Sequence, residues 1–211
     1  MPRSAEQKEE LANALSHGVG GLLGLAAWPA LAATADRPMA GPGQIGSTVF
    51  ALTMLLMFVA STVYHAAPAG PTRIRLQRLD HAAIFLFIAG SCTPFAIGNG
   101  SHPETWPMLA AVWLIALVGI GMKLGRRLRS PLSSTALYLA FGWLAGAAAL
   151  PMLDQLPPVS ATLLVAGGLA YTLGSGFYLM GRRVRYAHLA WHVMVLVGAG
   201  CHLLAVSQRG F

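Results

Sequence analysis

Seven stretches of apolar residues, separated by short polar connections, constrain this chain more than any other feature. Each is close to the ~20 residues that an α-helix needs to cross the ~30 Å hydrocarbon core of a bilayer. Composition agrees, because 55% of the 211 residues are hydrophobic and only 10% are charged, against about 25% charged in soluble domains. The sequence therefore predicts an all-α membrane protein, a seven-transmembrane helix bundle, with helices at about 16–34, 45–66, 81–99, 106–122, 133–150, 159–180 and 188–207.

The connections between these stretches are short, and none is long enough to form a separate soluble module. Pro and Gly clusters at 37–43, 67–71 and 156–158 mark three of them. We therefore expect a single domain over residues 1–211. The first apolar stretch runs past any plausible signal-peptide cleavage point, so we expect it to remain as a helix.

Basic residues concentrate in alternate connections, which predicts an orientation in the membrane. With seven crossings, 12 of the 14 Lys and Arg fall on one side: Arg3, Lys8, Arg73, Arg75, Arg78, Lys123, Arg126, Arg127, Arg129, Arg182, Arg183 and Arg185. The other side carries Asp36, Arg37, Glu104, Asp154 and Arg209. The positive-inside rule then places the N-terminus in the cytoplasm and the C-terminus outside. Because these charges lie at membrane ends, the net charge of +7 does not indicate nucleic-acid binding.

Three histidines near the ends of the apolar stretches have spacings that suit one metal site. His188 and His192 are four residues apart and so share a helix face, and Ser61 and His65 have the same relation in the second stretch. With the expected topology, all of them lie near the cytoplasmic side. Ionisable side chains inside a membrane are costly, so their presence indicates a functional site.

Asp80, at the expected start of the third helix, lies at the same depth as these histidines. Together with Ser61, the four ionisable residues fall within about two helical turns of one membrane surface. A single interfacial histidine more often snorkels or forms a hydrogen bond, but three with an aspartate at one depth favour a metal. Three imidazoles with water in a fourth position are the usual composition of a catalytic zinc site. We therefore predict that His65, His188 and His192 bind zinc.

We expect Asp80 and Ser61 to take part in catalysis at such a site. Asp80 either orients the water or a histidine, or acts as a general base toward that water. Ser61 donates a hydrogen bond to the water or to a developing oxyanion, unless it only holds helices together. His81 points about 100° away from Asp80 on a helix, so we expect it to lie around the site without binding the metal. This chemistry suits hydrolysis of an amide or an ester.

Glu10, Asn13 and His17 share one face where the chain enters the first apolar stretch, at the same membrane side. They either line the entrance to the site or support it, or else they form an ordinary capping and interfacial face. His202 lies about 15 Å deeper in the membrane than His192, too far to share its metal ion.

Four motifs spread over residues 10–192 follow one another in the order of a known family. They are Glu10-x-x-Asn13-x-x-Ser16-His17, Ser61-x-x-x-His65, Leu79-Asp80-His81 continuing into 84–95, and His188-x-x-x-His192. On these motifs the chain resembles the bacterial hemolysin III proteins, the prokaryotic branch of the progestin and adipoQ receptor family. The set is specific, whereas a single motif would not be.

The resemblance implies a seven-helix bundle with a cytoplasmic N-terminus in the bacterial inner membrane. It implies a zinc ion near the cytoplasmic face, held by His65, His188 and His192, with Asp80 and Ser61 close to it. Eukaryotic relatives look like receptors with ceramidase-type hydrolysis, and bacterial members are associated with hemolysis and with membrane-lipid homeostasis.

Three functions follow as hypotheses from the residues and the resemblance together. The first is a zinc-dependent intramembrane hydrolase of a lipid amide or ester bond, with a membrane lipid as substrate. The second is a sensor of lipid or membrane state in which the zinc is structural. The third is a pore or proton pathway, which Asp80, His81 and His202 at different depths suggest. The sequence does not predict an oligomeric state.

Overall fold

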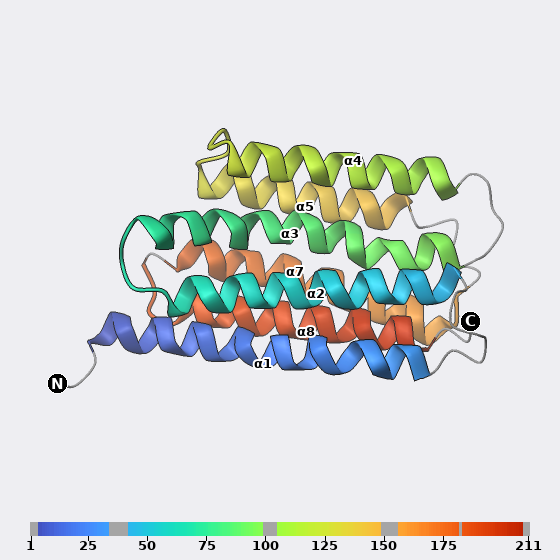
Figure 1. Ribbon diagram of the computed structural model, residues 1–211, viewed down its shortest axis with the longest axis horizontal. Coiled ribbons are helices and arrows are strands. Elements are labelled where there is room, and N and C mark those ends of the chain that lie inside the picture. The colour runs from blue at the N-terminus through green and yellow to red at the C-terminus, as the bar shows by residue number, and fades with distance from the viewer. Residues whose placement is uncertain (1–3, 34–41, 99–104, 149–155, 182, 209–211) are drawn as a thin grey trace.

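The computed structural model describes residues 4–33, 42–98, 105–148, 156–181 and 183–208. This part of the chain folds into seven α-helices that lie side by side as a bundle (Figure 1). They are α1 (Ala5–Ala33), α2 (Pro42–Ala66), α3 (Pro71–Gly98), α4 (Thr105–Leu124), α5 (Pro131–Ala148), α7 (Pro158–Met180) and α8 (Ala187–Ser207). The prediction of an all-helical chain is confirmed.

The surface of the bundle is apolar, as a protein surrounded by lipid requires. Five helices, α2, α3, α4, α7 and α8, are long and apolar enough to cross a membrane. Large aliphatic side chains point outward, among them Leu22, Leu114 and Leu173, whose exposed fractions are 68%, 63% and 67%. Apolar surface on this scale is unfavourable in water and favourable in hydrocarbon. The chain is therefore a multi-pass membrane protein.

Two helices begin earlier than the apolar pattern predicts. α1 begins at Ala5 rather than near residue 16, and Ser4 and Gln7 cap it reciprocally, with N–H···O distances of 2.8 and 3.2 Å. α3 begins at Pro71 rather than near residue 81, and proline suits the first turn of a helix. The apolar stretch marks the part of a helix that suits lipid, whereas the helix itself continues past it. Asp80 consequently lies inside α3 and not at its start.

Close helix packing joins the elements that carry the histidines. α2 packs against α1 and α3, α8 packs against α7, and α1 also contacts α8. Gly20 permits the approach of α1, because an added Cβ atom would lie 2.6 Å from the Phe58 ring of α2 and 2.8 Å from Leu196 of α8. A methyl group has no room at such distances.

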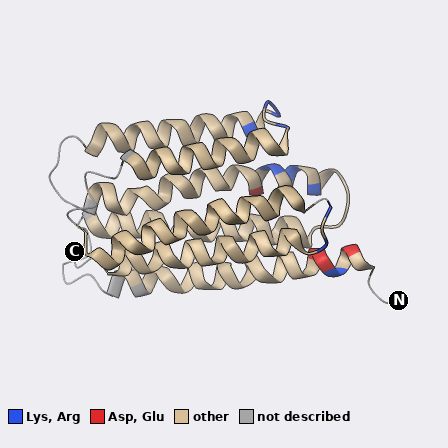
Figure 2. Ribbon diagram, turned by 180° about the vertical axis from the view of Figure 1, so that it is seen from behind, with Lys and Arg blue, Asp and Glu red and all other residues tan. Residues whose placement is uncertain are grey.

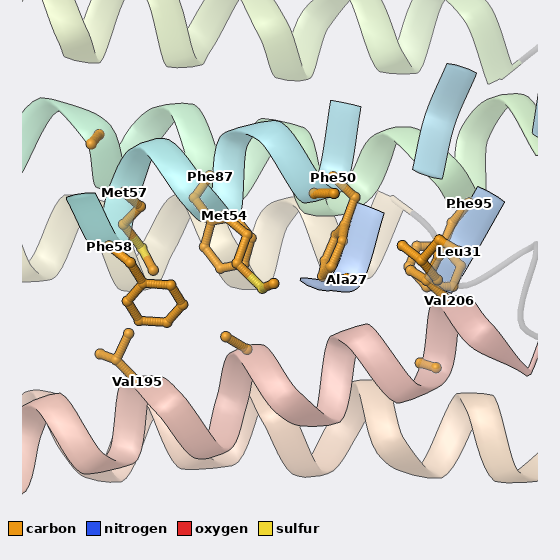
Figure 3. Packing of buried hydrophobic residues seen from close by; sticks show 14 of the residues in the cluster. Ala27, Leu31, Phe50, Met54, Met57, Phe58, Phe87, Phe95, Val195 and Val206 are labelled. Carbon is orange, nitrogen blue, oxygen red and sulfur yellow. The ribbon is translucent and has the colours of Figure 1, made fainter. Parts of the chain in front are cut away.

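The main core cluster extends along this packing. Phe50, Met54 and Phe58 from α2 are almost fully buried and point toward α8, where Val195 lies opposite Phe58 (Figure 3). A second cluster around Phe85 holds α3, α4 and α5 together. Burial of such side chains contributes about 1.5–3 kcal/mol each in water, but in lipid it acts mainly through shape. The clusters therefore set the relative positions of the helices that carry the polar residues.

Charged residues of the described chain collect at one end of the bundle, the end at which α1 begins (Figure 2). This agrees with the alternate pattern of basic connections. Lys123 differs from the expectation, because it belongs to the last turn of α4 and is buried instead of lying in a connection. Several charges that entered the orientation argument lie outside the described residues: Arg3, Asp36, Arg37, Glu104, Asp154, Arg182 and Arg209.

Candidate metal centre

The structure brings together the three histidines that the sequence singled out. His65 lies in the last turn of α2, and His188 and His192 lie in the first two turns of α8. One ligand atom from each lies within 4.8 Å of the others. His65 and His192 are buried, with exposed fractions of 4% and 1%. Three imidazoles at this separation could hold one metal ion.

His65 is held so that one of its ring nitrogens remains free. Its Nδ1 lies 2.7 Å from Oε2 of Glu10 on α1, whereas its Nε2 is buried with no hydrogen-bond partner. A carboxylate accepts hydrogen bonds, so Nδ1 carries the proton and Nε2 keeps a lone pair. A buried nitrogen without a partner is costly unless something binds it. The Nε2 lone pair is therefore well suited to a metal.

Glu10 links His65 to a basic residue. Its other oxygen, Oε1, lies 2.6 Å from Nη2 of Arg73 on α3. Partial burial raises the pKa of the Glu10 carboxyl, but the hydrogen bonds and charges of His65 and Arg73 outweigh burial and hold this pKa below its ordinary value. Glu10 is thus ionised at neutral pH and acts as a permanent acceptor for His65. Hydrogen-bond acceptors of this kind fix the tautomer of metal-binding histidines.

His192 is fixed in a similar way by backbone and hydroxyl oxygens of α1. Its Nδ1 lies 3.1 Å from the Asn13 carbonyl oxygen and 3.1 Å from Ser16 Oγ. Both groups accept a hydrogen bond, so the proton lies on Nδ1 and Nε2 keeps its lone pair. The ring of His17 stacks on that of His192, with centroids 3.6 Å apart. The structure thus places Glu10, Asn13 and His17 against the histidines, as a support for the cluster.

Asp80 and Ser61 lie on the wall of a cavity that His188 and His192 also line. The Ser61 hydroxyl is close enough to donate a hydrogen bond to the Asp80 carboxylate. His81 Nε2 lies 4.0 Å from Asp80 Oδ2, and the His81 carbonyl accepts a hydrogen bond of 2.9 Å from the Tyr138 hydroxyl. His81 thus lies beside Asp80, outside the group of three histidines.

This cavity has a volume of about 370 Å³ and lies mainly among α3, α5, α7 and α8, with α1 and α2 contributing at its histidine end. Apart from the polar residues at its histidine end, it is lined mainly by apolar side chains such as Phe87, Val165 and Leu156. His202 lines its deeper part, where its Nε2 lies 3.3 Å from the Leu164 carbonyl oxygen. As expected, His202 is not part of the three-histidine group. The three-histidine group therefore borders an elongated apolar space through His188 and His192.

Two functional-site candidates were missed by the sequence reasoning, Arg73 and Lys123. Both were counted only as basic residues of connections, whereas the structure pairs Arg73 with Glu10 and buries Lys123. The partner of Arg73 lies on another helix, and those of Lys123 lie in the next connection and on α5. Spacing within one helix therefore does not indicate either contact. For α1, the pair Ser4 and Gln7 was an available signal of an early helix start.

Comparison with known proteins identifies the family. The Haemolysin-III related family matches residues 5–203. The chain is 35% identical to the Hemolysin-3 homolog of Bacillus subtilis over 94% of its own length and 93% of that protein. It is 34% identical to the Hemolysin-3 of Bacillus cereus, covering 94% and 90% of the two chains.

A more distant similarity reaches the monocyte to macrophage differentiation factor of Homo sapiens, at 24% identity over 77% of this chain and 69% of that protein. No solved structure matches the chain. The family match covers nearly all of the helices that build the bundle and all three histidines. This chain belongs to the Haemolysin-III related family of membrane proteins.

Proposed function

We propose that this protein is a zinc-dependent intramembrane hydrolase that cleaves an amide or ester bond of a membrane lipid and serves membrane-lipid homeostasis. One observation carries the proposal: three histidines that could hold a metal ion, two of them buried and His65 with an unpartnered Nε2, lie at one end of an elongated apolar cavity that His188 and His192 line. Neither part alone would indicate lipid hydrolysis. Together, the histidines and the cavity support the proposal, because a metal held by the histidines would lie beside the headgroup end of a lipid chain in the cavity.

The donor set fits zinc. Three imidazole nitrogens without a fourth protein ligand are typical of a catalytic zinc site, whereas structural zinc sites have four protein ligands. The unpartnered Nε2 of His65 and the fixed Nδ1 protons of His65 and His192 agree with such a role. When bound, zinc supplies Lewis acidity and a water molecule with a pKa of about 7.

The residues of the chain then have distinct tasks. We assign to Asp80 the role of general base, because its carboxylate lines the cavity beside the histidines and receives a hydrogen bond from Ser61. A carboxylate in that position holds a proton at one of its oxygens and returns it to the leaving group. Ser61 keeps the carboxylate oriented and supplies a donor to the oxygen that becomes negative. Glu10 and the Asn13 carbonyl hold the two imidazoles in place.

The cavity fits the chain of a lipid. Its volume of about 370 Å³ lies within the ~300–1,000 Å³ of typical ligand pockets. Along α3 it extends from Asp80 to Phe95, which is about 22 Å at 1.5 Å per residue, over half of the ~30 Å hydrocarbon core. An acyl chain in this space would place its carboxyl end beside the histidines.

We further propose that all seven helices cross the bacterial inner membrane, with the N-terminus and the metal centre on the cytoplasmic side. α1 and α5 are not among the five helices that are long and apolar enough to cross a membrane, but both run alongside them in the bundle (Figure 1). The basic residues of α3 and of the connection between α4 and α5 gather at the end where α1 begins. The positive-inside rule makes that end cytoplasmic.

A sensor with a structural metal is the second candidate, and one feature favours it. α2 and α8 carry all three histidines, yet each packs more closely on α1 than the two pack on each other. A metal held by His65, His188 and His192 would therefore link α2 directly to α8. Without the metal, side-chain packing joins these two helices. In that case metal binding would change helix arrangement without turnover.

Reconstituted protein distinguishes these functions. Wild type and the Asp80→Asn variant would be incubated in vesicles with a panel of lipids that carry amide or ester bonds, and released fatty acid would be measured by mass spectrometry. The hydrolase predicts release by wild type and a loss on the order of 10²–10⁴-fold in the variant, with zinc content unchanged. Zinc-loaded wild type that releases no fatty acid from any lipid would favour the sensor.

A further inference from the structure

A second pocket lies at the same end of the bundle, next to the metal centre but separate from it. Its volume is about 250 Å³, and it is formed by α3, the end of α4, the following connection and the start of α5. His81 and Tyr178 line both this pocket and the apolar cavity, so they form the wall between the two. The function proposed above makes no use of this second pocket.

Lys123 is the unusual residue of this pocket. It is only 7% exposed, and its ammonium group donates hydrogen bonds of 2.8 Å to Ser134 Oγ and 3.3 Å to the Leu128 carbonyl oxygen. Both acceptors are neutral. Ion pairs in the described part of the chain involve Glu10 and Asp80 with other residues, and none includes Lys123. The Asp80 carboxylate of α3 interacts with Lys123 electrostatically, but the two side chains form no ion pair. A buried ammonium group without a direct counter-ion is costly.

The rest of the pocket adds positive charge and no carboxylate. Arg78 of α3 and Arg126 and Arg129 of the connection line it with Lys123. The connection is well ordered by its own hydrogen bonds, since Arg129 Nε donates to the Arg126 carbonyl oxygen at 2.9 Å. Arg126 adopts a positive φ of 61°, a backbone conformation that the surrounding turn must hold. The four cations thus belong to a built concavity.

The positive-inside rule explains why arginines gather at this end, but it does not explain a buried lysine. Arg75 and Arg127 show the difference, because both are exposed at the same end and neither lines the pocket. A counter-ion that binds in the pocket would satisfy Lys123. Basic pockets between transmembrane helices at the cytoplasmic side are suited to lipid headgroups.

We propose that this pocket binds the phosphate group of an anionic membrane lipid, with Lys123 as the central donor and the arginines around it. A phosphate group offers several acceptor oxygens and forms strong charge-assisted hydrogen bonds with Lys and Arg. The end of apolar helices is also the depth at which lipid phosphates lie. The binding needs neither metal nor catalysis, so a test of it does not depend on whether the protein is a hydrolase.

Lipid binding to the purified full-length protein tests the proposal. Native mass spectrometry would titrate the protein in detergent with dioleoyl phosphatidate and with dioleoylglycerol, which differ only by the phosphate. We expect phosphatidate to bind at least about tenfold more tightly, which corresponds to ~1.4 kcal/mol. Equal affinity for the two lipids would overturn the proposal. Inorganic phosphate, added as a competitor, distinguishes free phosphate from a lipid as the ligand. If inorganic phosphate displaces phosphatidate, free phosphate is the ligand. If it does not, the lipid is the ligand.

Two double variants with the same charge make the test specific to the pocket. Arg78→Gln with Arg129→Gln removes two pocket cations, and Arg75→Gln with Arg127→Gln removes two exposed cations from the same helix and the same connection. We expect the first to weaken phosphatidate binding at least about tenfold and the second to leave it within about twofold, at ~1 kcal/mol per cation near a headgroup. An equal loss in both would show only general attraction to a positive surface and would contradict a pocket.

Lys123→Met separates a ligand-binding lysine from a structural one. If Lys123 awaits an anion, the variant loses phosphatidate binding and keeps or gains thermal stability in lipid-free detergent, because an uncompensated buried charge is removed. If Lys123 only connects Leu128 and Ser134, the variant melts at a lower temperature. The pocket double variant and the exposed double variant then bind phosphatidate equally well. That second result would overturn the proposal.

Discussion

Two of the three histidines, His65 and His192, are held by different kinds of partner, and this difference determines how firmly each ring is fixed. Glu10 accepts from His65, and the Asn13 carbonyl and Ser16 hydroxyl lie beside His192 Nδ1. The ionised acceptor forms a charge-assisted hydrogen bond, which is stronger than a bond to a neutral acceptor and fixes the His65 ring more firmly. Asn13 acts through its backbone, so its side chain is not what holds the ring.

Replacing Glu10 tests this support. Glu10→Gln removes the negative charge next to His65 Nδ1 while keeping the size of the side chain. We expect zinc affinity to fall by about 10–100-fold, the usual effect of losing a partner of a metal-binding histidine, with little change in helix content. Competition with a zinc chelator measures the affinity. Glu6→Gln, an exposed change on the same helix, should leave it unaltered, and a matching loss there would argue against a specific contact.

How far the sequence predicts these residues depends on whether their relation is local. The shared face of His188 and His192 follows from their spacing alone, and the approach of His65 followed once the loop charges set the direction of each helix. The pairing of Glu10 with Arg73 joins two helices far apart in sequence. Lys123 is buried where the end of α4 meets the following connection and α5. No pattern within one helix contains that information.

At the scale of the elements, α1 is the support of the metal centre. It supplies the contacts to His65 and His192 and packs on both α2 and α8. The sequence predicts its apolar part well, but its polar first turns carry Glu10 and Asn13 and lie before the apolar stretch. Hydropathy therefore finds the membrane-crossing part of a helix better than its beginning, which is decided by capping.

Two neighbouring glycines of α1 show how close that packing is. At Gly20 a Cβ atom would lie 2.6 Å from the buried Phe58 ring, whereas at Gly21 the nearest side-chain atom is 3.9 Å away. Gly20→Ala should therefore lower the free energy of unfolding relative to Gly21→Ala by ~1–3 kcal/mol, the cost of an overpacked contact. Its melting temperature should accordingly be the lower of the two. Both changes gain the same helix propensity, so it cancels. Thermal unfolding in detergent gives the comparison, and equal melting temperatures would contradict a tight α1–α2 contact.

For the whole molecule, the arrangement of charge and apolar surface gives the protein two unlike ends. Basic residues gather where α1 begins, around the metal centre and the second pocket, while the apolar cavity extends away from them. The sequence predicted the apolar segments and the charged end. It did not predict the cavity, because a void depends on how side chains of several helices meet and not on any one helix alone.

The proposed orientation is tested by labelling single cysteines. In a background with Cys92→Ala and Cys201→Ala, Ser4→Cys and Gln208→Cys mark exposed positions at the two ends of the chain. A membrane-impermeant maleimide applied to intact spheroplasts should label the Gln208→Cys variant at once and the Ser4→Cys variant only after lysis, because the positive end faces the cytoplasm. The reverse pattern would show that the protein has the opposite orientation in the membrane. Labelling of both variants before lysis would rule out an odd number of crossings.

The metal content of the purified protein tests the account most directly. Protein prepared without chelators would be analysed by inductively coupled plasma mass spectrometry as wild type and as the His188→Ala and His202→Ala variants. The account predicts about one zinc per chain in wild type and in the His202→Ala protein, because His202 lies outside the three-histidine group, and a near-complete loss with His188→Ala, which removes one of three ligands. Wild type free of metal, or a His188→Ala protein that retains as much zinc as wild type, would contradict it.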